Sequence, residues 1–95
     1  MSALPPPIDH SQPTTFVVTD IEADGPNPLE SSMLSFASVA CDVKGKVLAE
    51  FEAVLVPRAD RKPHPDTMAW WQTQPEAWLH ATENAEPPDV VMPRY

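Results

Sequence analysis

The feature that most constrains this chain is an apolar run that ends in two acids and a turn. Residues 16–25 (FVVTDIEADG) predict a strand, because β-branched and aromatic residues lead into an Asp-Gly pair that is typical of turns. Side chains of a strand alternate between its two faces, so Asp20 and Glu22 should share one face, roughly 7 Å apart along the backbone. We expect the two carboxylates to occupy one site.

A divalent cation would explain why two acids lie so close together. The apolar residues of this strand, Phe16 to Val18 and Ile21, are expected to be buried, and carboxylates near buried apolar groups repel each other. A cation offsets this repulsion, and carboxylate oxygens suit Mg²⁺ or Mn²⁺. The pair therefore predicts a metal site at Asp20 and Glu22. The alternative is a strand end with both acids in solvent, because the Asp-x-Glu motif is short.

The surrounding segments resemble those of a known enzyme family. Residues 17–25 (VVTDIEADG) resemble the first motif of the DEDD superfamily of 3′-to-5′ exonucleases, which includes RNase T and oligoribonuclease. Residues 35–40 (SFASVA) and 51–55 (FEAVL) resemble the second and third strands of that ribonuclease H-like fold. Residues 65–71 (PDTMAWW) resemble the segment after the third strand in a bacterial and phage branch. The resemblance spans about residues 15 to 80, the front half of such a domain.

The resemblance implies an enzyme that removes nucleotides from the 3′ ends of single-stranded DNA or RNA. Asp20 would bridge two divalent ions and Glu22 would bind one of them; the ions would activate a water and stabilise the charge on the displaced phosphate. The backbone at Ala23 and Asp24 would lie against the terminal nucleotide. Asp24 has a second interpretation, as the Asp of the Asp-Gly turn.

The chain contains only part of the motif set that the family uses. Such enzymes have two further acids in later motifs, with a histidine or tyrosine base beside the last. His80 is not that base, because the family places an aspartate five residues later and position 85 is alanine. We therefore expect this chain to belong to a longer protein and to be weakly active or inactive alone. The alternative function is a non-catalytic ribonuclease H-like domain kept for protein association.

The expected fold is α/β: the front portion of a ribonuclease H-like domain, with a three-stranded antiparallel sheet followed by short helices. Proline-rich residues 1–14 predict a disordered N-terminal arm, and residues 15–95 form the domain portion. Strands are expected at residues 15–22, 33–43 and 46–56, and helices should begin at Pro65 and Pro75. The first strand would be an open edge, through which the chain could form a homo-oligomer.

Several other side chains have two interpretations. Glu50 and Glu52 could bind metal, but acids on a solvent-facing edge strand are the ordinary explanation. The loop residues Arg58, Arg61 and Lys62 could contact phosphate or simply be solvated. The tryptophans at positions 70, 71 and 78 could stack on bases, but packing against the sheet is favoured for at least two of them.

Composition limits the class of protein. A net charge of −8 excludes the broad basic surface of proteins that grip nucleic acid by its phosphates, although a chain end held through metal ions needs no such surface. The single cysteine, Cys41, cannot form an internal disulfide. No segment of the sequence has the charged start and apolar core typical of a signal peptide, and no apolar run is long enough for a membrane span. We expect a cytoplasmic protein with no membrane partner.

Overall fold

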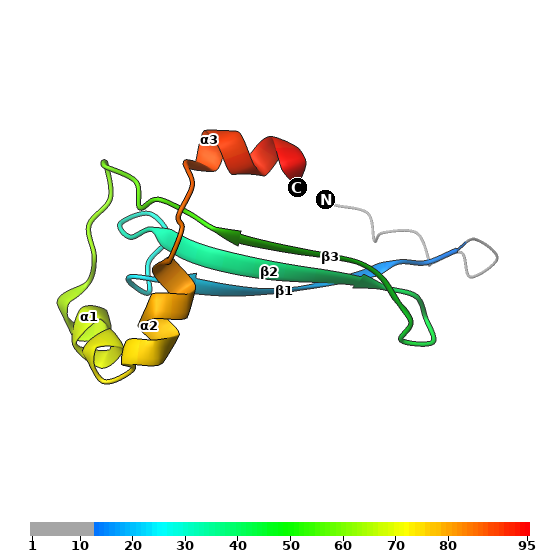
Figure 1. Ribbon diagram of the computed structural model, residues 1–95, viewed down its shortest axis with the longest axis horizontal. Coiled ribbons are helices and arrows are strands. Elements are labelled where there is room, and N and C mark those ends of the chain that lie inside the picture. Colours follow the sequence, from blue (N-terminus) through cyan, green and yellow to red (C-terminus); the bar gives the residue numbers. More distant parts are fainter. Residues whose placement is uncertain (1–12) are drawn as a thin grey trace, which may run out of the picture.

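The computed structural model describes residues 13–95, so nearly all of the expected arm, residues 1–14, lies outside the described residues. The chain forms a three-stranded antiparallel sheet followed by short helices (Figure 1), which confirms the expected α/β class. The ribonuclease H-like assignment stays a prediction. The elements are β1 (Phe16–Ala23), β2 (Met33–Cys41), β3 (Val47–Val54), α1 (Pro65–Gln72), α2 (Pro75–Thr82), α3 (Pro88–Val91) and the 3-10 helix η1 (Met92–Arg94).

Strand β2 is central, and β1 and β3 are the two edges of the sheet. A tight turn joins β2 to β3, and the Asp42 carboxylate accepts hydrogen bonds from the backbone N–H groups of Lys44 and Lys46 at 2.9 and 3.0 Å. Gly45 has a φ of 83°, a conformation that favours glycine. Helices α1 and α2 each begin with a proline, at the positions expected from the sequence.

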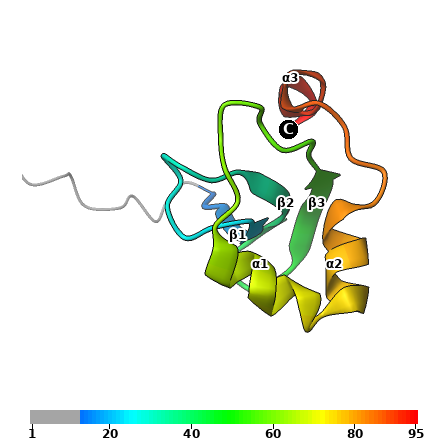
Figure 2. The same cartoon turned by 90° about the vertical axis from the view of Figure 1, so that its left-hand side faces the viewer.

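The helices cover the sheet unevenly. Helices α1 and α2 lie together at one end of the sheet, and α3 lies on the other side of it (Figure 2). Two clusters of buried residues result. One joins Leu34 to Trp71 and Ala81 of the first two helices. The other joins Phe36 and Leu55 of the sheet to Val91 of α3.

A bulge in β2 explains how Leu34 and Phe36, two residues apart in one strand, reach different clusters. Glu22 lies opposite Ser35, but Ala23 lies opposite Met33, so Leu34 is an extra residue in β2. An extra residue interrupts the strict alternation of side chains. Leu34 therefore packs under α1 and α2, whereas Phe36, two residues later, packs with the cluster on the α3 side.

The apolar residues of β1 are exposed, and the expectation that they are buried was wrong. The exposed fractions are 52% for Phe16, 59% for Val17, 64% for Val18 and 55% for Ile21. The reason is that β1 is an edge strand: α1 and α2 lie at one end of the sheet, and the segment from α3 to Tyr95 packs on Phe36 and Phe51 of β2 and β3 (Figure 1). The expected open edge on the first strand is confirmed.

The tryptophans divide as the core interpretation predicted. Trp71 is buried, Trp78 packs against the same cluster, and the two rings meet edge to face with centroids 5.5 Å apart. Trp70 is 52% exposed. Within residues 13–95, no helix has the length and apolar character needed to cross a bilayer.

Two loops at the carboxyl end of β1 are joined by hydrogen bonds. Lys62 donates its N–H to the Glu30 carbonyl at 2.7 Å, and the Ser31 hydroxyl donates to the Lys62 carbonyl at 3.0 Å. Gly25 lies between them: a Cβ on this residue would be 1.9 Å from Ser31 Oγ and 3.0 Å from His64 Cβ. Close packing therefore requires glycine at this position.

We expect Gly25→Ala to lower the free energy of unfolding by about 1–3 kcal/mol, because the added methyl group overlaps the Ser31 side chain. Urea denaturation of the two proteins measures the difference. The matched control is Ser31→Gly, alone and combined with Gly25→Ala. The double variant should be more stable than the sum of the two single effects, because the overlap is absent. Additive effects would contradict this explanation.

Candidate functional site

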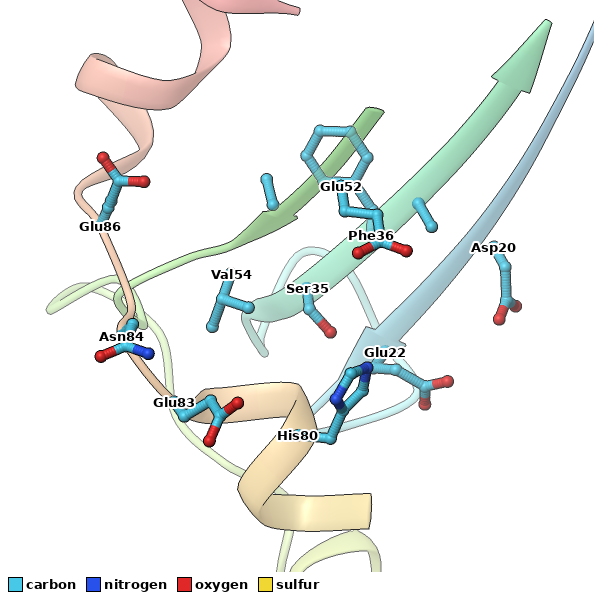
Figure 3. Close-up of a pocket in the computed structure, with 12 residues that line it drawn as sticks. Asp20, Glu22, Ser35, Phe36, Glu52, Val54, His80, Glu83, Asn84 and Glu86 are labelled. Atoms are coloured by element: carbon cyan, nitrogen blue, oxygen red, sulfur yellow. The ribbon is translucent and has the colours of Figure 1, made fainter. Parts of the chain in front are cut away.

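Asp20 and Glu22 line one open hollow of about 430 Å³ on the sheet (Figure 3). The hollow is bounded by all three strands and by the segment that begins at the end of α2. The described residues that line it include no Lys or Arg. Its ionisable side chains are Asp20, Glu22, Glu52, His80, Glu83 and Glu86.

The two acids of the motif lie on the same side of β1, as the alternation of strand side chains predicted. Figure 3 shows both carboxylates directed away from the sheet on this side. Ile21, between them in sequence, instead lines a second hollow with Met33 and Leu55 on the opposite face. Glu22 is half-buried and Asp20 is exposed. Both carboxylates are therefore open to a ligand that approaches this face.

Glu52, on β3, also lines the hollow. Asp20 pairs with Ala37, and Ala37 pairs with Glu52, so the three residues form one row across the sheet. The small alanine leaves space between the two acids. Glu52 is exposed on an edge strand, as its ordinary interpretation predicted, yet it faces the same hollow as Asp20. Counting residues from the turn at Asp42 would instead place Phe51 opposite Ala37, because the pairing of β2 with β3 shifts by one residue at Cys41.

The remaining ionisable residues come from α2 and the segment after it. His80 is in the last turn of α2 and is exposed, in agreement with its interpretation as a helix-terminal histidine. Figure 3 shows its ring directed from α2 toward Glu22. Glu83 and Glu86 follow the helix. No local signal could have brought these residues to the hollow, because their position depends on how α2 packs on β2.

The described part of the chain does not supply a complete metal site. Among residues 13–95, no three His, Cys, Asp or Glu side chains are arranged to hold one ion. Mg²⁺ commonly binds proteins through one or two carboxylates and fills its remaining positions with water or substrate oxygens. The arrangement of Asp20 and Glu22 is chemically suited to that mode, and a second ion would need further ligands.

Asp24 lies outside the hollow. Its side chain is 4% exposed, and one carboxylate oxygen accepts a hydrogen bond from the Ser32 N–H at 2.7 Å. The Asp24 N–H in turn donates to the Ser32 carbonyl at 3.1 Å. These bonds agree with the interpretation of Asp24 as a turn residue. The predicted contact of Ala23 and Asp24 with a nucleotide stays a prediction.

Two basic residues of the loop before α1, Arg58 and Arg61, donate hydrogen bonds to nearby groups of the protein. Arg58 donates two hydrogen bonds to the Asp60 carboxylate, at 2.9 and 2.7 Å, and these bonds hold the pKa of Asp60 below its usual value. Arg61 donates to the Leu29 carbonyl. The contacts favour the solvated-loop interpretation over a phosphate site.

Comparison of the chain with family models, with curated proteins and with solved structures found no match. The exonuclease assignment therefore depends on the motifs of the chain itself and on the geometry of its acidic hollow.

The different surroundings of Asp20 and Asp24 predict different effects on stability. Asp24→Ala should lower the free energy of unfolding by about 1–3 kcal/mol, because it leaves a buried N–H of Ser32 without its acceptor. Asp20→Ala should change it by no more than about 0.5 kcal/mol, because the side chain is exposed. Urea denaturation at neutral pH measures both values. Equal losses would contradict the structural role of Asp24.

Proposed function

We propose that this chain carries the first metal-binding motif of a metal-dependent 3′-to-5′ exonuclease that acts on single-stranded DNA or RNA ends. The observation that supports the proposal most directly is the shared position of Asp20 and Glu22 in one accessible hollow. In this proposal Asp20 and Glu22 would hold Mg²⁺ or Mn²⁺ ions, with Asp20 as the shared ligand. The backbone at Ala23 and Asp24 would lie against the terminal nucleotide.

The charge of the hollow supports a role for cations. Five carboxylates line it, and the described lining has no Lys or Arg to balance them. Such a surface repels a phosphodiester until bound cations reverse its local charge. Divalent ions would then do three things: hold the 3′ end, lower the pKa of the attacking water, and stabilise the charge on the leaving oxygen.

Activity of this chain alone should be weak or absent. A two-ion site needs more ligands than Asp20 and Glu22 provide, and the described residues form no group of three. In the family that the motifs resemble, two later acids and a base complete the site. We therefore assign the metal-binding motif to this chain and the complete reaction to a protein that also holds those later residues.

A non-catalytic association domain is the second candidate, and the exposed β1 supports it. An edge strand whose apolar side chains are exposed on both faces is a template for pairing with another strand. Pairing of β1 with a second copy of the chain would cover these residues and produce a homo-oligomer.

The association candidate predicts that Val18→Lys reduces self-association. Val18 is 64% exposed on β1, so the change should leave the fold intact and place a charge in the proposed interface. Sedimentation velocity over a range of concentrations measures the oligomeric state. Leu79→Lys, at a residue that is 60% exposed on α2, is the control. A wild-type protein that stays monomeric would contradict the homo-oligomer.

The exonuclease proposal predicts that the wild-type chain binds Mn²⁺ and that Asp20→Asn weakens binding by at least about tenfold. Even groups that only support a ligand contribute that much, and Asn removes a charged oxygen ligand. Isothermal titration measures the affinity. Glu76→Gln removes the same charge from the first turn of α2, away from the hollow, and should bind Mn²⁺ like wild type. Equal losses of Mn²⁺ affinity in both variants would mean that binding depends only on the net charge of the protein, which would contradict a metal site at Asp20.

A further inference from the structure

The peptide unit between Ala23 and Asp24, one residue beyond Glu22, is held at both of its polar groups. The Ala23 carbonyl accepts a hydrogen bond from the Trp71 indole N–H at 3.0 Å. The N–H of the same peptide unit, on Asp24, donates to the Ser32 carbonyl at 3.1 Å. The regular pairing of β1 with β2 is interrupted at this position, between Glu22 and Ala23. These two bonds therefore support the backbone where the sheet register is irregular.

Helix α1 supplies two of the contacts to this segment. The Trp71 indole comes from its last turn, and the His64 N–H, at its start, donates to the Asp24 carbonyl at 2.8 Å. Trp71 is itself fixed, since it is 4% exposed and packs with Leu34. A donor held in a packed core has one orientation, so it constrains the carbonyl that it binds.

We infer that Trp71 is a positioning residue for Glu22. Its indole N–H fixes the Ala23 carbonyl, and the fixed backbone holds the Glu22 carboxylate on the side of the sheet that Asp20 faces. Trp71 does not line the hollow, so its effect on a ligand passes through the end of β1. This inference rests on the proposed metal-binding role of Asp20 and Glu22. It adds a supporting residue 48 positions from Ala23 in sequence to the two acids of the motif.

Metal affinity is the property that separates positioning from simple packing. Ligand groups must be held within about 0.5 Å of their binding geometry, and loss of a supporting hydrogen bond typically weakens metal binding 10–100-fold. A tryptophan that served only the core would affect folding without a selective effect on the acids.

The test is Mn²⁺ titration of Trp71→Phe, which keeps an aromatic ring in the core and removes the N–H donor. We expect affinity to fall about tenfold in protein that circular dichroism shows to be folded. Trp70→Phe makes the same change at an exposed neighbour on the same helix and should bind Mn²⁺ like wild type. Unchanged affinity in Trp71→Phe, or an equal loss in Trp70→Phe, would overturn the inference.

A second variant covers the case in which Trp71→Phe does not fold. Benzothienylalanine at position 71 keeps the size of the indole and replaces its N–H with sulfur. The same tenfold loss of Mn²⁺ affinity is expected, and wild-type affinity would overturn the inference.

Amide hydrogen exchange tests the positioning without metal. In the variants at position 71, the Asp24 amide should exchange at least about tenfold faster relative to amides in the β2–β3 ladder, as expected for loss of one hydrogen bond to a partly buried carbonyl. A wild-type protein that binds no Mn²⁺ would overturn the proposed function. The exchange rate of the Asp24 amide would still test whether Trp71 fixes the backbone after Glu22. Unchanged exchange at Asp24 would overturn the inference that Trp71 positions Glu22.

Discussion

The extra residue at Leu34 is the constraint on which the rest of the structure depends. In a regular β2, Leu34 and Phe36 would point to the same face of the sheet and would pack with the same helical unit. The bulge lets β2 contribute Leu34 to the cluster with Trp71 while Phe36 packs with Val91. Helices α1 and α2 are thereby anchored at the end of the sheet where β1 finishes.

This anchoring brings charged residues together from distant parts of the chain. Asp20 of β1 and Glu52 of β3 face the same hollow, and the small side chain of Ala37 on β2 lies between them. Helix α2 brings His80 to this hollow. The few basic residues near β1 are instead engaged in the loop that contains Arg58 and Asp60. The result is a local excess of negative charge on one face, which a polyanionic substrate would approach only with cations between them.

The two ends of β1 have opposite characters. Its carboxyl end is held by the Asp24 carboxylate, by the start of α1 and by the Trp71 indole. Its amino-terminal half exposes Phe16, Val17 and Val18. A strand fixed at one end and uncovered at the other is suited to two roles, presentation of its acids and pairing along its free edge. The candidate enzyme and the candidate association domain use these different parts of one strand.

Local patterns in the sequence were sufficient for the three strands and for the first two helices, but α3 and η1 were not predicted. The β-branched run before Asp20 predicted the first strand, and the prolines at positions 65 and 75 predicted where two helices begin. Each signal acts through the backbone conformations available to a few adjacent residues. The common side of Asp20 and Glu22 follows from the same local geometry, because alternation is a property of a single strand.

The exposure of β1 and the membership of the acidic hollow were decided by tertiary structure. An apolar strand is expected to be buried, but burial depends on what packs against it, and the C-terminal segment of the described chain packs on β2 and β3 and leaves β1 exposed. Glu52 and His80 have no local pattern that links them to Asp20, because only sheet register and helix packing bring them close. The sequence by itself determined the three strands, the starts of α1 and α2, and the common side of the two acids on their strand. The tertiary structure determined their neighbours, because contacts between distant segments depend on the packing of the whole chain.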